Sequence, residues 1–352
     1  MVVREVWTSR SASSRTSATM PALRLAKHPL AWLDLRGLGL SALERLSLEE
    51  LLLRHDPSNR CWGIVGCHEP AKNRLLTAGG GAGRNTSCAI VLGIGGKLDR
   101  LVNVPAAKRD GVLVLRRFSG GGTVVVDHDS LWTTFIGRND APLSASGERV
   151  EPFPREIMAW SADTIFRHAF HRWNKKSLDG ARRRGTKTLV VRGKSCGVSG
   201  SLSESLILPP DGSPTLDDVA IPTFQLKEND YVLGERKMGG NAQSIVSSGF
   251  LHHTSFLWDY DPSNMDYLTL PEKRPDYRRD RSHDDFLLKL KETFGHHSNK
   301  SEFFDHVKAA AGQTFDLEDR TFNEVLDIAN DKFGSLQQWF DGKCRTKIVP
   351  LQ

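Results

Sequence analysis

Long apolar runs, a cysteine framework and a strong net charge are all missing from this sequence of 352 residues. No stretch approaches the ~18 consecutive apolar residues that a membrane helix requires, so we expect no integral membrane protein. The five cysteines are irregularly spaced and include no CxxC pair, which argues against a disulfide scaffold, a secreted protein and a zinc site. A net charge of +6 is too small to indicate nucleic-acid binding, but it suits an acidic protein partner or a phosphate-bearing substrate.

Acidic residues are scarce at the start of the chain, where Glu5 is the only one in residues 1–30. Arginine, serine and threonine are frequent there instead. This composition is typical of an organelle-targeting peptide, and a disordered N-terminus without a targeting role is the alternative. We therefore predict a disordered leader over residues 1–30 and a mitochondrial location, with a plastid or the cytoplasm as the other options.

Short apolar runs separated by glycine-rich or polar turns predict β-strands. These runs are Trp62–Val65, Ala89–Leu92, Val112–Leu115 and Thr123–Val126. Leucines interleaved with glutamate and arginine predict an amphipathic helix over Leu46–Leu53. The strands follow one another through hairpin-like turns, and no strand–helix–strand rhythm is visible.

The last part of the chain has a helical pattern, with segments that start near Ser282, Ser301 and Phe322. We therefore predict a main domain over residues 31–281 and a short helical C-terminal extension over residues 282–352.

Two stretches, residues 69–87 and residues 172–216, are predicted to be inserted surface loops, the first because it has no periodicity and the second because a basic run is followed by serine, glycine and proline. The first is glycine-rich and could bind phosphate, and the second is basic and could bind nucleic acid. The strand-then-helix context of a phosphate loop and the interleaved aromatic residues of a nucleic-acid site are missing, so we favour loops.

Two arginines and three consecutive glycines lie between two predicted strands, from Arg116 to Gly122. Three glycines let the backbone approach a ligand closely and direct successive N–H groups at an anion. An arginine at the same place adds a bidentate donor for a carboxylate or a phosphate. A tight hairpin with solvent-facing arginines is the alternative.

A single lysine, Lys237, precedes Gly239 and Gly240 in a segment that runs from Asn229 to Ala242. Its ammonium group is a compact point charge, suited to an α-phosphate and a carboxylate oxygen that the glycines admit to the backbone. A surface lysine in a hairpin is the alternative.

Two adjacent histidines, His252 and His253, stand at the start of an apolar strand. Neighbouring strand residues point to opposite faces, so at most one of the two can face a site. No carboxylate or cysteine lies at metal-ligand spacing, which favours a hydrogen-bonding or core histidine over a metal ligand.

Together these segments resemble the motifs of the lipoate–protein ligase family, within the biotin/lipoate ligase superfamily, and most of all its plant and algal branch. The family pattern RRxSGGGxV matches Arg116 to Val124, and the HHxS/T element matches His252 to Ser255. The pattern NDxxxxGxKxxGxA matches Asn229 to Ala242, except that Gly234 comes one residue early. The resemblance implies an α/β (α+β) fold with a mixed, largely antiparallel sheet and helices packed on one face, and the hairpin-like strand order agrees.

The resemblance also implies a reaction. Lipoate or octanoate would react with ATP, with Mg²⁺ as the expected metal, to give acyl-AMP, and the acyl group would pass to a lysine of an acidic lipoyl domain. The implied partners are the lipoyl domains of 2-oxoacid dehydrogenase complexes and the H protein of glycine cleavage, with no nucleic acid and no membrane. An ATP-independent octanoyl or lipoyl transferase that uses Cys196 as a thioester, a biotin ligase, and a non-catalytic lipoyl-domain binding protein are the alternatives.

Residue roles follow from the same resemblance. Lys237 would be the catalytic residue, holding the carboxylate and the α-phosphate. The residues expected to bind the acyl and adenylate groups are Arg117, Ser119, Gly120, Gly121, Gly122, Asn229, Asp230, Gly239, Gly240, Asn241, Ala242 and His253. The stretch Val125 to Ser130 departs from the bacterial pattern, and the C-terminal part has no clear match to the bacterial accessory domain.

Overall fold

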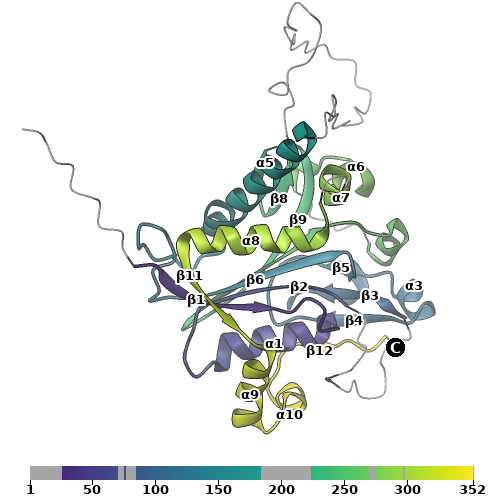
Figure 1. Cartoon of the computed structure of the whole chain (residues 1–352). Helices are drawn as coiled ribbons and strands as arrows, with labels where there is room; N and C mark the ends of the chain where they lie inside the picture. Colours follow the sequence, from purple (N-terminus) through teal and green to yellow (C-terminus); the bar gives the residue numbers. More distant parts are fainter. Residues whose placement is uncertain are drawn as a thin grey trace, which may run out of the picture.

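The computed structural model of this chain describes residues 26–69, 75–76, 85–183, 223–269, 275–295 and 298–351 (Figure 1). These residues form a large and a small β-sheet with helices packed around them. Most of the predicted leader, most of both predicted loops, and Cys196 lie outside the described residues. Within the described part of the chain, no helix has the length and apolar character needed to cross a membrane.

The large sheet has eight strands in the order β11-β1-β2-β6-β10-β9-β8-β7. These strands are β1 (His28–Asp34), β2 (Trp62–Cys67), β6 (Ser130–Arg138), β7 (Phe224–Lys227), β8 (Asp230–Leu233), β9 (Arg236–Val246), β10 (Gly249–Leu257) and β11 (Phe315–Arg320). Strand β1 pairs in parallel with β2 and β11, and the other neighbours pair antiparallel. The predicted mixed, largely antiparallel sheet is therefore confirmed.

The small sheet has four strands in the order β12-β4-β3-β5. These strands are β3 (Asn85–Leu92), β4 (Val112–Arg116), β5 (Val124–Asp127) and β12 (Lys347–Ile348). All four apolar runs predicted as strands are strands here, as β2, β3, β4 and β5. The connection from β4 to β5 is the predicted arginine–glycine segment.

Helices lie on both faces of the large sheet, whereas the sequence predicted them on one (Figure 1). One face carries α4 (Pro154–Ser161), the π-helical η1 (Ala162–Phe166), α5 (Arg167–Arg183) and α8 (Lys300–Thr314). The other carries α1 (Ala42–His55), α9 (Phe322–Phe333) and α10 (Leu336–Gly342). The reason is visible in β6, where Phe135 enters one core while Trp132 and Ile136 enter the other. A strand with apolar side chains on both faces needs cover on both.

The shorter helices lie at the edges of this framework. They are α2 (Leu98–Leu101), α3 (Val104–Arg109), η3 (Pro262–Tyr267), η4 (Asp276–Arg278), α6 (His283–Phe286) and α7 (Leu290–Phe294). The α2 and α3 segments pack beside the small sheet. The α6 segment lies next to β9, through a bridge between Leu287 and Lys237.

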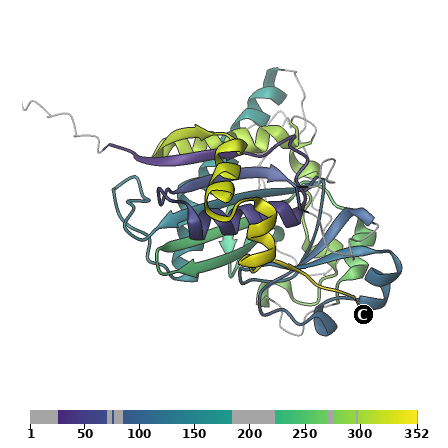
Figure 2. The same cartoon turned by 90° about the horizontal axis from the view of Figure 1, so that it is seen from below.

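Helix α1 confirms the predicted helix but has no solvent-facing polar side, because every residue from Ala42 to Leu53 is buried. The covering segment is the C-terminal part of the chain, which Figure 2 shows crossing α1 and continuing to the small sheet. The indole nitrogen of Trp339 donates to the carbonyl of Ser47 at 3.1 Å. The carboxylate of Glu50 accepts from the backbone N–H of Arg345 at 2.9 Å.

Three predicted boundaries are corrected by the structure. The C-terminal extension over residues 282–352 is not only helical, because β11 pairs with β1 and β12 pairs with β4. Strand β1 begins at His28, inside the predicted leader. Helix α5 runs to Arg183, so the first part of the second predicted loop is helical. Each of these segments is held by contacts with a distant part of the chain, which local patterns do not reveal.

Candidate functional site

The three segments predicted from the sequence meet at strand β9. The backbone N–H of Gly120 donates to the carbonyl of Gln243 at 2.7 Å, which joins the glycine loop (Ser119–Gly122) to β9. The hydroxyl of Ser119 hydrogen bonds to Nε2 of His253 at 2.9 Å, which joins the same loop to β10. Across the β9–β10 ladder, Ala242 and His253 are direct partners. The structure thus assembles one site from the three segments, while the role of each residue stays a prediction.

The described ladder between β8 and β9 ends at Gly240. Beyond that residue, the glycine loop lies along β9 in place of β8. Gly121 has φ +108°, and a Cβ there would lie 2.8 Å from the carbonyl oxygen of Asn241 and 3.0 Å from Cβ of Ala242. At Gly122 a Cβ would meet nothing within 4 Å. The middle glycine is therefore needed for the close approach of two backbones, and its neighbour faces open space.

Arg117 supports this loop and does not point outward. Its guanidinium is buried and donates to the carbonyls of Val91 at 3.2 Å, Gly120 at 3.1 Å and Gly122 at 2.7 Å. Burial lowers the pKa of Arg117 to about 10. The side chain holds the shape of the loop, and the N–H of Gly120, predicted to face an anion, is already used by β9.

Lys237 lies on the same face of the sheet as Asp230 and Gly240. Its Nζ is 2.8 Å from Oδ1 of Asp230, and a Cβ at Gly240 would lie only 3.5 Å from Nζ. A bulge in the β8–β9 ladder pairs Val232 with Lys237 and Asp230 with Gly240, so these side chains share one face. The lysine reaches across a glycine that leaves room beside its amine. Its side chain is 26% exposed, whereas that of Asp230 is 8% exposed.

The same face continues toward the histidine. Gly240 and Ala242 are two residues apart on β9, and Ala242 pairs directly with His253. Lys237 and His253 therefore lie at two ends of one surface, with small residues between them. The part of this surface that could hold an anionic group is the cationic end, at the partly exposed amine of Lys237.

Two of the residues predicted to bind substrate face the other way. A Cβ at Gly239 would lie 2.9 Å from the ring of Phe256, in the core. The side chain of Asn241 accepts from Thr254 Oγ1 at 2.7 Å and donates to the carbonyl of Asn229 at 3.0 Å. The contacts of Gly239 and Asn241 support the strand, and Asn241 also positions Asn229.

A buried hydrogen-bond chain extends from the site into α1. Nδ1 of His253 is 3.1 Å from Oε2 of Glu49, whose other oxygen accepts from Nε of Arg45 at 2.8 Å and from Oγ1 of Thr134 at 2.6 Å. Burial alone would raise the pKa of Glu49, but Arg45, His253 and Thr134 together bring it below its usual value. The carboxylate is thus ionised and can only accept.

That charge determines the hydrogen positions on His253. Nδ1 must donate to Glu49, and because burial lowers the pKa of His253, the neutral imidazole accepts at Nε2 from the hydroxyl of Ser119. The sequence alone did not predict the hydrogen-bonded chain Ser119–His253–Glu49. Its signal in the sequence is the pair of acids Glu49 and Glu50 inside a leucine run, a pattern that is equally typical of an amphipathic helix.

His252 points to the opposite face, as the alternation of strand residues predicts. Its ring hydrogen bonds to the hydroxyl of Tyr231 at 3.2 Å and the amide of Gln243 at 3.0 Å. Burial lowers the pKa of His252 to about 3. The residue is a neutral core histidine.

The described residues hold no cluster of three or more histidine, cysteine, aspartate or glutamate side chains that could bind a metal ion. The described cysteines that the structure leaves free are Cys61, Cys67, Cys88 and Cys344. Burial raises the pKa of Cys344 to about 12 and that of the other three to about 11. Thiols of this kind are poor nucleophiles at neutral pH.

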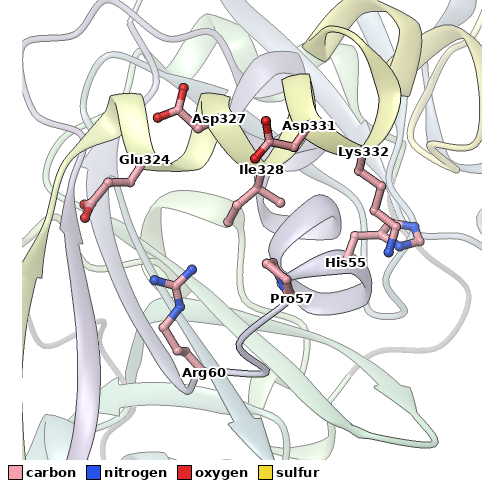
Figure 3. Close-up of a pocket in the computed structure, with 8 residues that line it drawn as sticks. All are labelled: His55, Pro57, Arg60, Glu324, Asp327, Ile328, Asp331 and Lys332. Carbon is pink, nitrogen blue, oxygen red and sulfur yellow. The ribbon is translucent and has the colours of Figure 1, made fainter.

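A surface hollow of about 490 Å³, separate from the predicted site, lies between α9 and the end of α1 (Figure 3). It is lined by His55, Pro57, Arg60, Glu324, Asp327, Ile328, Asp331 and Lys332. Most of these side chains are charged, and none belongs to the predicted site.

The lipoyl protein ligase A/B catalytic domain family has a model that matches residues 84–312. The chain is 29% identical over 220 residues to the inactive lipoate–protein ligase 2 of Plasmodium falciparum (isolate 3D7). This alignment covers 59% of the chain and 48% of that relative, so the chain spans about half the length of the curated relative that it matches.

Solved structures similar to the fold include P. falciparum LipL1 in complex with lipoate, with TM-score 0.49 and 14% identity over 89% of this chain and 71% of that one. A lipoate-protein ligase A bound with ATP has TM-score 0.48 and 15% identity over 87% and 95%. A bipartite lipoate protein ligase of Thermoplasma acidophilum, studied with its E2 lipoyl domain, has TM-score 0.48 and 15% identity over 92% and 100%.

Proposed function

Because the chain belongs to the lipoyl protein ligase A/B catalytic domain family, we propose that it activates lipoate or octanoate with ATP and transfers the acyl group to a lysine of a lipoyl domain. The observation that carries this proposal is the position of Lys237, a partly exposed amine beside Gly240 on the same sheet face as His253. The net charge of +6 suits acidic lipoyl domains as partners, and the leader composition suits a mitochondrial location.

Adenylation brings a carboxylate against an α-phosphate, so two anions must meet while charge develops on the phosphate. A compact ammonium group with space beside it can contact both anions at once. Lys237 has that space because its neighbour is Gly240. The protein needs no nucleophile of its own, since the acyl-adenylate is already activated for attack by the acceptor amine.

Mg²⁺ is the metal that such a reaction implies. It usually binds through one or two carboxylates together with nucleotide phosphates. Asp230 is a carboxylate at the site, now bound by Lys237 and by the hydroxyl of Tyr277. The residues therefore fit a cation that arrives with the nucleotide and neutralises phosphate charge, and they do not fit a permanent metal cage.

The relative in Plasmodium, whose name calls it inactive, favours a second candidate: a protein that binds lipoyl domains without catalysis. A thioester transferase has less support from the described thiols, because burial raises their pKa values. Cys196, the thiol predicted for such a transferase, lies outside the described residues. The ligase and the non-catalytic binding protein differ in one respect, which is whether the protein releases pyrophosphate from ATP in the presence of octanoate or lipoate.

The test is pyrophosphate release by the wild type, Lys237→Ala and a matched control, Lys227→Ala. Lys227 lies near the same hairpin, is also 26% exposed and also forms an ion pair, with Glu235. We expect Lys237→Ala to lose ~10²–10³-fold or more in rate, by analogy with the loss of one preorganised donor. Lys227→Ala should retain nearly full activity. Lys237→Arg should be as inactive as Lys237→Ala, because a planar guanidinium is bulkier than an ammonium.

The melting temperature of each variant shows whether it is folded. A folded Lys237→Ala with normal pyrophosphate release would refute the assignment of Lys237. A wild type that releases no pyrophosphate but binds a lipoyl domain would refute ATP-dependent activation and support the second candidate.

A further inference from the structure

Residues 275–288, which we call the arm, lie along the β8–β9 hairpin. The backbone N–H of Tyr277 donates to the carboxylate of Glu228 at 3.3 Å, before the hairpin begins. Nη1 of Arg281 donates to the carbonyl of Glu235 at 2.8 Å, at the hairpin turn. The arm thus holds the hairpin from one end to its turn, and it contains no residue that the sequence motifs assign to the site.

The arm also reaches the two charged residues of the site. The backbone N–H of Leu288 donates to the carbonyl of Lys237 at 2.7 Å. The hydroxyl of Tyr277 donates to Oδ2 of Asp230 at 2.8 Å, while Nζ of Lys237 is 2.8 Å from Oδ1. Tyr277 and Lys237 therefore share one carboxylate, with one donor on each oxygen.

This sharing matters for the chemistry of the lysine. While its amine is paired with Asp230, much of its positive charge is offset by the carboxylate. To contact two substrate anions, the amine has to leave Asp230, whose side chain is only 8% exposed. A buried carboxylate that loses its last donor carries a large desolvation penalty, and this penalty would oppose the release of the lysine.

Tyr277 is fixed in the position that reduces this penalty. Its ring packs on Phe286, with 5.3 Å between ring centroids, and its carbonyl accepts from Nη2 of Arg281 at 2.6 Å. Burial and the charge of Asp230 both raise the pKa of Tyr277, so its hydroxyl stays protonated and remains a donor.

On the basis of the proposed function, we propose that Tyr277 is a positioning residue that keeps Asp230 hydrogen-bonded when Lys237 leaves it. The hydroxyl thereby determines how readily the lysine turns from Asp230 to the anionic substrates. Without the Tyr277 hydroxyl, Lys237 alone of these two donors remains on Asp230, and the ion pair between Lys237 and Asp230 becomes tighter.

The test compares Tyr277→Phe with Tyr267→Phe. The hydroxyl of Tyr267 donates to Asp110 at 3.1 Å, beside the small sheet, so the control removes a similar tyrosine–aspartate hydrogen bond elsewhere. The first readout is the rate at which acetic anhydride acetylates Lys237, measured by mass spectrometry at several fixed pH values. Lys227 serves as the internal reference in every sample.

We expect Tyr277→Phe to slow acetylation of Lys237 by about tenfold, the effect of roughly 1.4 kcal/mol, which is close to the lower end of the range for one hydrogen bond to a charged group. In the pyrophosphate assay the KM for ATP should rise by a similar factor with little change in kcat, because the lysine is held back before substrate binds. Tyr267→Phe should match the wild type in both assays.

An unchanged or faster acetylation of Lys237 in a folded Tyr277→Phe would overturn the inference, as would an equal fall in the control. A fall in kcat alone would also overturn it, since that pattern indicates distortion of the site. Acetylation needs no turnover, so a wild type without pyrophosphate release would refute the proposed function while the acetylation rates still decide the role of Tyr277.

Discussion

Replacing Glu49 by glutamine would keep the shape of the side chain at the centre of the buried chain and remove its charge. The carboxylate of Glu49 is fully buried and accepts from Arg45, Thr134 and His253. After the change, the guanidinium of Arg45, which is 1% exposed, would lie in the core without the carboxylate it is paired with.

The expected loss of stability follows from that burial. Breaking a buried ion pair by removing one partner costs about 3–5 kcal/mol. We expect about 3 kcal/mol, at the lower end of that range, because the amide oxygen of glutamine can still accept from Arg45 or Thr134. At roughly 2–4 °C per kcal/mol for a domain of this order of size, the melting temperature should fall by about 6–12 °C.

The loss should also depend on pH. Because Arg45 and the other partners outweigh burial and lower the pKa of Glu49, the charge stabilises the folded state above its unfolded pKa of 4.5. This contribution disappears as the pH falls through the lower, folded value. The difference in unfolding free energy between the wild type and Glu49→Gln should therefore narrow at low pH.

Denaturant unfolding at about pH 7, and at the lowest pH where both proteins remain folded, measures this difference. The matched control is Glu50→Gln, since Glu50 is equally buried on the same helix and also pairs with an arginine, Arg54, at 3.0 Å. Its other oxygen accepts from the backbone of Arg345 and Thr346 and not from the site histidine. Glu50→Gln should lose stability and keep pyrophosphate release, whereas Glu49→Gln should lose both, because His253 loses the partner that fixes its hydrogen positions. The same free-energy difference at both pH values would refute the reasoning.

Two further predictions concern the glycine loop and the buried histidines. Gly121→Ala should destabilise the fold by about 1–3 kcal/mol, because its φ is +108° and the new Cβ would lie 2.8 Å from the carbonyl of Asn241. The control, Gly122→Ala, should melt close to the wild type, because a Cβ there meets nothing within 4 Å. Equal melting temperatures of the two variants would contradict this prediction. Burial lowers the pKa of His252 to about 3 and that of His55 to about 4, so both stay neutral when folded and take up a proton on unfolding. The free energy of unfolding should therefore be unaffected by these two histidines above their unfolded pKa of 6.5 and should decrease as the pH falls from 6.5 toward 4. A free energy of unfolding that stays constant across that range would count against this prediction.

The glycine loop, Lys237 and His253 could be found from the sequence because each stands in a segment whose composition is unusual for its position. Three glycines between strands and a lysine before two glycines are unfavourable for ordinary strand packing, so they indicate a site. Only the family resemblance implies that these three segments come together at β9. The contact that joins them, from the N–H of Gly120 to the carbonyl of Gln243, depends on how the strands are ordered in the sheet.

Glu49 and Tyr277 could not be found in this way. A glutamate in a leucine-rich helix normally faces water, and Glu49 is buried only because distant strands and the C-terminal part of the chain enclose α1. Tyr277 lies in an irregular segment with no periodicity, and it matters because the arm brings it to Asp230. In both cases the signal belongs to the tertiary structure.

Strands β11 and β12 have a consequence for how the protein is synthesised. They complete sheets that contain the first described strand, β1, and the strand that leads into the glycine loop, β4. Trp339 and Ser47, which hydrogen bond to each other, are 292 residues apart in the sequence. Contacts between such distant segments form only after the later one has left the ribosome. A growing chain would therefore hold α1 with its carboxylates uncovered until β11, Trp339 and β12 have emerged, so solubility should depend on synthesis at least as far as Ile348.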